Sequence, residues 1–392
     1  MSGSATVVVL ALSGVAGGLA GYILNRCMSW LLEEIRLTEI SHSSHVQDSR
    51  ELESQSIVLV ILLGSATAVG VVWWEVISHG LLVQNVIGPS TTTTALFLRA
   101  GGHLVFFWFL AAAAWVDIRY RVIPDVITTP GVICGLVAMA ISPQVLLPIT
   151  AVTERSFAAA SLTADFLVAW GPLNSSRAIS SSWPHFVIGV VVFIFWWVAC
   201  TSRWTIKTSV RSQGVVQRAI RCMKEPRSIV FVIGVAILFI VNLDGGIRLA
   251  ATQSGMIGLA ISAGIVWITR AGASAALGRE AMGMGDVTLM AMVGIWLGWQ
   301  PAVLTFFLAT FIGLAHGLIQ FFLHRENELP FGPSLCLAAV MITLFWQSVW
   351  SRFSFVFDDV VQLGTVLILV VMLTAITLFI WRWVREKIRP MA

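Results

Sequence analysis

The sequence predicts an all-α protein, a bundle of about eleven transmembrane helices. Of its 392 residues, 57% are hydrophobic and only 11% are charged, whereas soluble domains usually carry about a quarter charged residues. The hydrophobic residues also gather in runs of roughly twenty, the length that crosses the hydrocarbon core of a bilayer. These observations exclude a soluble globular enzyme, a disordered scaffold and a disulfide-stapled secreted module.

Each predicted span is an apolar run bounded by polar or charged residues. The first run has no basic residue before it, which favours an uncleaved span with its N-terminus outside. The eighth and ninth runs meet at Gln300 and Pro301, where we expect the helix to hinge. The runs lie near residues 5–24, 56–79, 95–116, 126–149, 184–200, 228–243, 255–273, 286–300, 302–323, 332–350 and 363–383.

The basic residues alternate between the two sides of these spans. With the N-terminus outside, the loops on the cytoplasmic side hold 19 of the 24 lysines and arginines. This asymmetry is what the positive-inside rule predicts, so the C-terminus is expected in the cytoplasm. The net charge of +4 is then explained by the lipid bilayer, and we predict no nucleic-acid partner.

Five segments follow from this arrangement of spans and loops. They are 1–94, N-terminal spans with a short charged cytoplasmic loop (25–55); 95–150, spans with a first aspartate; 151–250, an external Ser-rich loop, an extra span pair and a basic cytoplasmic loop; 251–350, spans with a glycine-aspartate motif; and 351–392, a C-terminal span and basic tail. Within 25–55 the spacing predicts a short amphipathic surface helix. The five cysteines form no CxxC pair, so no metal site is predicted.

Two aspartates stand at span ends on the predicted cytoplasmic side. Asp117 follows an apolar run and begins the sequence DIRYRVIPD, and Asp286 ends the sequence REAMGMGD. A carboxylate at the edge of an apolar span is costly and suggests a functional site. If two carboxylates share one proton, one can activate water while the other polarises a carbonyl, without a metal or cofactor. From spacing alone, helix capping explains these residues as readily as catalysis does.

The glycines before Asp286 would let another chain approach closely. Gly283 and Gly285 carry no Cβ, so the backbone there can bend sharply. A substrate peptide could then lie as an extended strand beside this stretch, with its scissile carbonyl near the acids.

Three strings resemble one protein family in the same order. Residues 278–287 (GREAMGMGDV) closely resemble the glycine-x-glycine-aspartate segment of prepilin peptidases, the type IV leader peptidases of bacteria, which are membrane aspartic proteases. Residues 117–125 (DIRYRVIPD) resemble the first aspartate motif of that family. Residues 330–333 (PFGP) resemble its later proline-glycine stretch. The resemblance covers roughly residues 95–150 and 255–350.

The resemblance implies an activity, partners and a location. Asp117 and Asp286 would be the catalytic pair of an endopeptidase that needs no cofactor and no metal. The family cleaves the basic leader peptide from type IV prepilins and pseudopilins, after a glycine, at the cytoplasmic face of the bacterial inner membrane. Six further residues would support the pair: Gly283, Gly285, Glu280, Arg119, Pro330 and Gly332.

The sequence departs from the family pattern in three places. Four spans lie between the aspartates where the family usually has two, so 184–243 looks like an inserted pair. Thr288 stands where relatives usually carry Lys. The loop after the first span lacks the two CxxC pairs of many relatives, so methyl transfer to the new N-terminus is not predicted.

Two other classes of function remain open on the sequence alone. A catalytically inactive scaffold of a pilus or secretion system would keep the same spans without turnover. A proton-coupled transporter would place its acids near the middle of the membrane and show a repeat between its halves. The sequence names neither the pilin substrate nor the oligomeric state.

Overall fold

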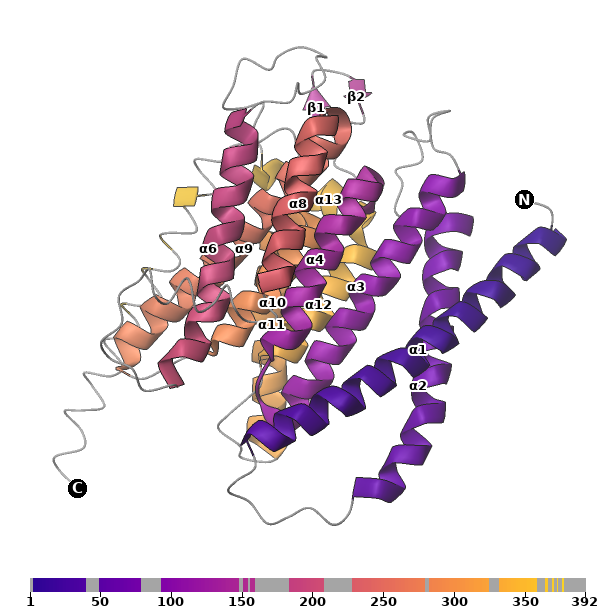
Figure 1. Ribbon diagram of the computed structural model, residues 1–392, viewed down its shortest axis with the longest axis horizontal. Helices are drawn as coiled ribbons and strands as arrows, with labels where there is room; N and C mark the ends of the chain where they lie inside the picture. Colours follow the sequence, from indigo (N-terminus) through magenta and orange to yellow (C-terminus); the bar gives the residue numbers. More distant parts are fainter. Residues whose placement is uncertain are drawn as a thin grey trace. The chain divides into compact units, whose positions relative to one another are not determined.

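Nearly all elements of the computed structural model are helices (Figure 1), so the predicted all-α fold is confirmed. Strands β1 (Ala151–Thr153) and β2 (Ser156–Ala158) form one short antiparallel pair. The structure describes residues 3–39, 49–78, 93–147, 151–153, 156–158, 183–207, 228–278, 282–323 and 331–357, with single positions at 364, 365, 369, 372 and 376.

The helix bounds follow in chain order. The α-helices are α1 (Gly3–Glu39), α2 (Ser49–Val72), α3 (Thr93–Tyr120), α4 (Asp125–Ile141), α6 (Trp183–Lys207), α8 (Ser228–Asp244), α9 (Gly246–Leu277), α10 (Met284–Leu297), α11 (Trp299–Leu323), α12 (Gly332–Leu344) and α13 (Trp346–Phe353). Three short helices of other types are the π-helix η1 (Trp73–Ile77) and the 3-10 helices η3 (Pro143–Val145) and η4 (Ser354–Phe357).

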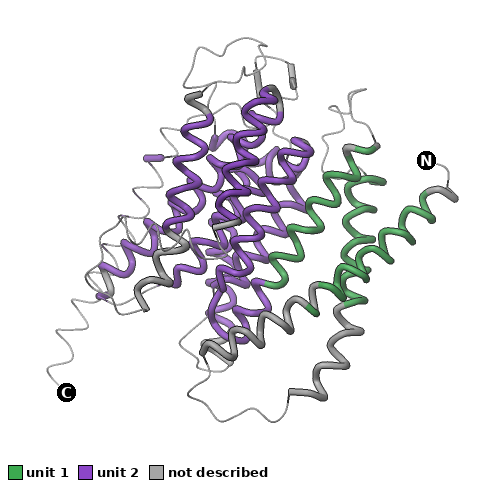
Figure 2. Tube along the Cα trace, viewed as in Figure 1, with its two compact units in different colours: residues 1–112 green, residues 113–392 purple. Residues whose placement is uncertain are grey.

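The chain forms two compact units, residues 1–112 and 113–392 (Figure 2). In the first unit α1 packs along α2. A Cβ on Gly17 would collide with Ala68 and with the carbonyl oxygen of Gly64. Small residues therefore let the two backbones approach closely, as at many helix contacts in membranes.

The first unit also buries a charged cluster that the sequence did not reveal. Glu75 lies in η1, with its Oε2 3.3 Å from Nε of Arg99 and its Oε1 2.6 Å from Nδ1 of His103. All three side chains are at most 5% exposed. A charge left unpaired in apolar surroundings is costly, so these contacts favour the arrangement in which η1, at the end of α2, lies beside α3.

Helix α10 lies at the centre of the second unit. It packs against α4, α9, α11 and α12, and every residue from Asp286 to Leu297 is buried. The indole Nε1 of Trp296 donates a hydrogen bond of 2.8 Å to the carbonyl oxygen of Gly131 in α4. A helix that is apolar on every face is expected to be surrounded in this way.

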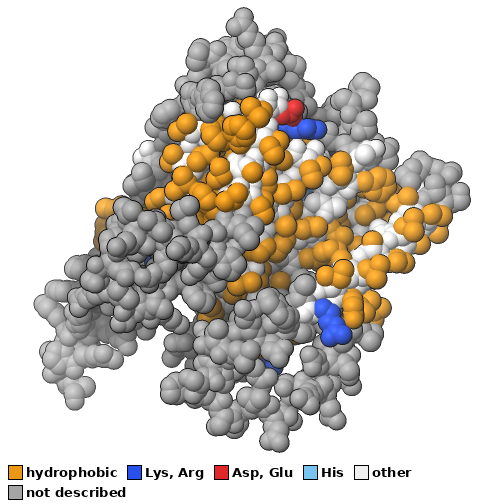
Figure 3. Space-filling model, in the orientation of Figure 1, with side chains coloured by type: hydrophobic (Ala, Val, Ile, Leu, Met, Phe, Trp, Pro, Cys, Tyr) orange, Lys and Arg blue, Asp and Glu red, His pale blue; other side chains and the backbone are white. Residues whose placement is uncertain are grey.

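The described helices present apolar side chains on the surface (Figure 3). Four of them contain segments long and apolar enough to cross a membrane, and the bent pair α12–α13 would make a fifth. These segments are Thr6–Ile23, Leu96–Tyr120, Ala251–Ala275 and Trp299–Ile319. Shorter apolar helices occupy five of the other predicted spans, whereas 363–383 lies mostly outside the described residues. A multi-pass membrane protein is supported, and the number of eleven spans stays a prediction.

Three local expectations differ from the structure. The break between the eighth and ninth spans lies at Gly298, which has a φ of 86°, and not at Gln300 and Pro301. Proline fits the first turn of α11, where its missing N–H costs nothing. The predicted span 332–350 is bent by 87° between α12 and α13. The part of 25–55 predicted as a short amphipathic surface helix is helical up to residue 39, but it continues α1 and does not form a short helix of its own.

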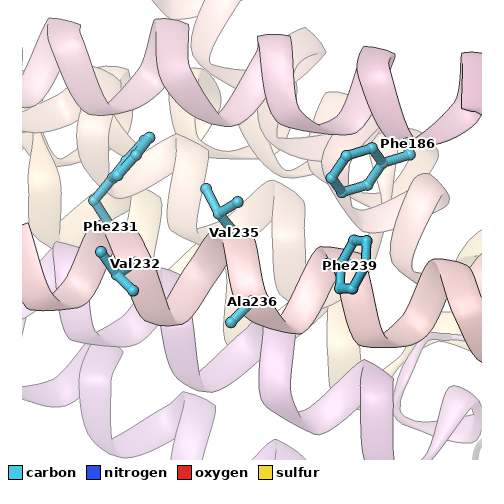
Figure 4. Close-up of a pocket in the computed structure, with 6 residues that line it drawn as sticks. All are labelled: Phe186, Phe231, Val232, Val235, Ala236 and Phe239. Carbon is cyan, nitrogen blue, oxygen red and sulfur yellow. The ribbon is translucent and has the colours of Figure 1, made fainter.

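Helices α6 and α8, which cover the segment predicted to be an insertion, form an apolar groove (Figure 4). The rings of Phe186 and Phe239 meet edge to face across it, with centroids 5.8 Å apart. Helix α8 also packs on α4 and α9, and both α6 and α8 are part of the second unit. The groove is lined by Phe186, Phe231, Val232, Val235, Ala236 and Phe239.

Candidate active site

Asp117 lies in the last turn of α3 and is only 5% exposed. The helix ends there because Arg121 adopts a left-handed conformation, with a φ of 55°. Its N–H donates a 2.8 Å hydrogen bond to the carbonyl oxygen of Asp117. This turn reverses the chain after α3 and brings Ile123 back toward the aspartate.

Helix α12 approaches Asp117 with its first residue. The backbone N–H of Gly332 donates a hydrogen bond to the Asp117 carboxylate. A Cβ on Gly332 would collide with Oδ2 of Asp117 and would lie 2.8 Å from Cδ1 of Ile123. Only glycine therefore fits at this position without displacing the carboxylate.

Asp286 lies in the first turn of α10 and is 8% exposed. The residue before this helix, Gly283, is exposed and extended, and a Cβ built there would lie 3.6 Å from Oδ2 of Asp286. A Cβ on Gly285 would lie 2.8 Å from Cβ of Ile123. The first glycine thus leaves open backbone beside the carboxylate, and the second allows α10 to pack against the turn after α3.

The thiol of Cys336 relates the two aspartates in space. Cys336 is buried in α12, one turn after Gly332, and it interacts electrostatically with both Asp117 and Asp286. The ends of α3, α10 and α12 therefore bring both carboxylates near one side chain. Both aspartates are thus buried in the same region of the second unit, and their action as an acid pair stays a prediction.

The chemistry of such a site is general acid–base catalysis. Two buried carboxylates near each other favour a state in which they hold one proton between them. The exposed, extended backbone at Gly283 offers a place beside Asp286 where a peptide could pair in extended form. The site could therefore direct a water molecule at a peptide carbonyl.

Of the other predicted site residues, the structure describes some and not others. Arg119 is exposed in the last turn of α3, and no ion pair joins it to either aspartate within the described part of the chain. Glu280 and Pro330 lie outside the described residues. Across the ranges that the structure describes, no group of three or more His, Cys, Asp or Glu side chains could hold a metal ion.

Sequence reasoning missed two residues that contact this site. Cys336 lies four residues after Gly332, a spacing that puts both on one face of α12. The Nε of Arg270 donates a 2.8 Å hydrogen bond to the carbonyl oxygen of Met282, just before Gly283. No sequence signal pointed to this contact, because it depends on how α9 packs against α10.

The region around Asp286 is similar to a known protein family. Residues 223–318 match the model of the type IV leader peptidase family. The predicted resemblance to prepilin peptidases is confirmed. The matched segment contains Asp286 and its glycines, whereas Asp117 lies before it.

Several curated relatives bear the name prepilin leader peptidase/N-methyltransferase. One from Pseudomonas aeruginosa is 42% identical over 72 residues, which is 18% of this chain and 24% of the relative. One from Aeromonas salmonicida is 39% identical over 72 residues, with the same shares. One from Neisseria gonorrhoeae is 31% identical over 111 residues, 28% of this chain and 38% of the relative.

The chain thus spans between about a quarter and two fifths of the length of these relatives. No solved structure matches the chain.

Proposed function

We propose that this protein is a membrane-embedded aspartic endopeptidase that removes the basic leader peptide from type IV prepilins or pseudopilins. The observation that carries the proposal is the position of Asp117 and Asp286. Both are buried, and both lie near the thiol of Cys336, Asp117 in the last turn of α3 and Asp286 in the first turn of α10. The leader peptidase match around Asp286 supports the choice of substrate.

In the proposed mechanism the two carboxylates share one proton. The ionised carboxylate takes a proton from water as the water oxygen attacks the scissile carbonyl carbon, and the protonated carboxylic acid donates its proton to the carbonyl oxygen. The tetrahedral intermediate then collapses: the carboxylic acid of the pair donates its proton to the leaving nitrogen, the C–N bond breaks, and the carboxylate takes a proton from a hydroxyl of the intermediate, so that the pair again holds one proton. The Gly332 amide fixes the orientation of the Asp117 carboxylate through both steps.

The proposed location is the bacterial inner membrane, with the acid pair at its cytoplasmic face. The distribution of basic residues supports this placement, because both aspartates fall on the Lys/Arg-rich side of the predicted spans. The bilayer would hold the hydrophobic stem of the prepilin while its basic leader enters the site. Methyl transfer is not part of the proposal, although the relatives' names include it.

The test is leader cleavage in membrane vesicles that contain the protein. The substrate is a prepilin with a basic leader ending in glycine, added with the leader exposed, and the products are identified by mass. Inside-out vesicles should release the leader by cutting after the glycine, and sealed right-side-out vesicles should not. Membranes without the protein are the control.

Two results would contradict the proposal. Folded protein that leaves several such prepilins intact would favour the inactive scaffold. Cleavage confined to right-side-out vesicles would contradict the cytoplasmic site.

A further inference from the structure

Helices α9 and α10 pack antiparallel along a regular seam. A Cβ on Gly258 would collide with the carbonyl oxygen of Gly294, and one on Gly294 would collide with that of Gly258. One turn further along α9, Oγ of Ser262 donates a 2.7 Å hydrogen bond to the carbonyl oxygen of Met290. Four residues forward on α9 therefore correspond to four residues back on α10, which fixes the register of the pair.

The same register extends past Asp286 to the glycine loop. By its four-residue steps, the α9 residue level with Asp286 is Val266, which is fully buried. The next step pairs Arg270 with Met282, and Nε of Arg270 indeed donates a 2.8 Å hydrogen bond to the Met282 carbonyl oxygen. The seam thus continues one turn beyond Asp286, although α10 begins only at Met284.

A second hydrogen bond fastens the same stretch from within α10. Oγ1 of Thr288 donates to the carbonyl oxygen of Gly285 over 3.0 Å. This bond joins two residues of one helical turn, so it cannot fix the loop to the rest of the molecule. Of the two bonds, the one from Arg270 is the one that ties the loop to another helix.

We propose that Arg270 is a positioning residue for the acid pair. Its guanidinium group, which belongs to α9, holds the backbone carbonyl of Met282. Gly283 then stays extended, and Asp286 enters the site at a fixed place. The proposal rests on the peptidase activity proposed above, and it assigns Arg270 no contact with the substrate. An error of about 1 Å in such a placement can cost around 100-fold in rate.

The test compares Arg270→Gln and Arg270→Lys with the wild type. The matched control is Arg248→Gln, because Arg248 lies near the other end of α9, half exposed and paired with Asp244 over 3.1 Å. In purified protein reconstituted in bilayers, kcat and KM for prepilin cleavage are measured together with the thermal midpoint. We expect R270Q to lower kcat about 10- to 100-fold at similar KM, R270K to recover part of the loss, and R248Q to match the wild type.

A second readout does not depend on activity. Amide hydrogen exchange of a peptide covering residues 282–288 should be faster in R270Q than in the wild type, and unchanged in R248Q, because the loop loses its tie to α9. If the wild type cleaves no leader, the peptidase proposal fails while this exchange still decides the role of Arg270.

Three results would overturn the assignment to Arg270. They are wild-type kcat in R270Q, a rise in KM alone, and unchanged exchange in the loop. A positioning role would also be contradicted if R270Q lowered both kcat and the thermal midpoint and R270K recovered neither, because general destabilisation would then explain the loss.

Discussion

Replacing Gly332 by alanine tests how tightly Asp117 is held. The added Cβ would collide with Oδ2 of Asp117 and would lie 2.8 Å from Cδ1 of Ile123. Ile123 packs with its Cβ and backbone on Gly285, so Ile123 contacts both halves of the site and is not free to shift as a whole. The carboxylate is therefore expected to swing away and lose its hydrogen bond from the Gly332 amide.

The size of this effect follows from the bond that is lost. A hydrogen bond to a charged group contributes about 1.5–3 kcal/mol, which corresponds to roughly a 10- to 150-fold fall in kcat if it acts in the transition state. The assay is prepilin cleavage by purified protein in bilayers, with rates normalised to folded protein. Substrate affinity should change little, because Gly332 lies against the catalytic side chain.

Gly264→Ala is the matched control for this substitution. Gly264 lies in α9 of the same unit, and a Cβ there would have no heavy atom within 4 Å. Alanine should therefore keep full activity and stabilise the helix by up to about 1 kcal/mol. A wild-type kcat in Gly332→Ala, or an equally large fall of kcat in Gly264→Ala, would show that the Asp117 carboxylate does not depend on the space at Gly332.

Two further predictions concern stability. Glu75→Gln removes the charge that compensates Arg99 in the buried cluster, so it should destabilise the first unit by about 3–5 kcal/mol; thermal unfolding in mild detergent would show this, and an unchanged midpoint would contradict it. Trp296→Phe keeps an aromatic ring but removes the indole N–H that donates to the carbonyl oxygen of Gly131, and the loss of this bond should cost about 1–3 kcal/mol. A loss no greater than that of Trp267→Phe, whose ring is half exposed, would argue against the bond.

The sequence predicted the helices and the acid pair because both leave strong local signals. Apolar runs identify helices without reference to their neighbours. Asp117 and Asp286 stand out because carboxylates are rare at the ends of such runs. The sequence predicts that both aspartates lie on the same side of the membrane, but it does not predict how close together they lie.

The rest of the site could not be predicted, because it depends on contacts between helices. Nothing in the sequence near Arg270 shows that it faces Met282, and the buried cluster of Glu75, Arg99 and His103 joins residues 24 and 28 positions apart. The bend after Leu344 was missed because the apolar run continues through it. The break at Gly298 was placed two residues late, since proline is a stronger signal for a hinge than glycine.

The most direct test of the central claim is leader cleavage by purified variants of the two aspartates. Asp117→Asn and Asp286→Asn keep the shape of each side chain but remove its ability to exchange a proton. Asp244→Asn is the matched control, because Asp244 is about half exposed and pairs with Arg248. If the two carboxylates act as one acid–base pair, the wild type and the Asp244 variant cut after the leader glycine and both site variants are inactive. Cleavage at the wild-type rate by either folded site variant would contradict catalysis by Asp117 and Asp286 as a pair.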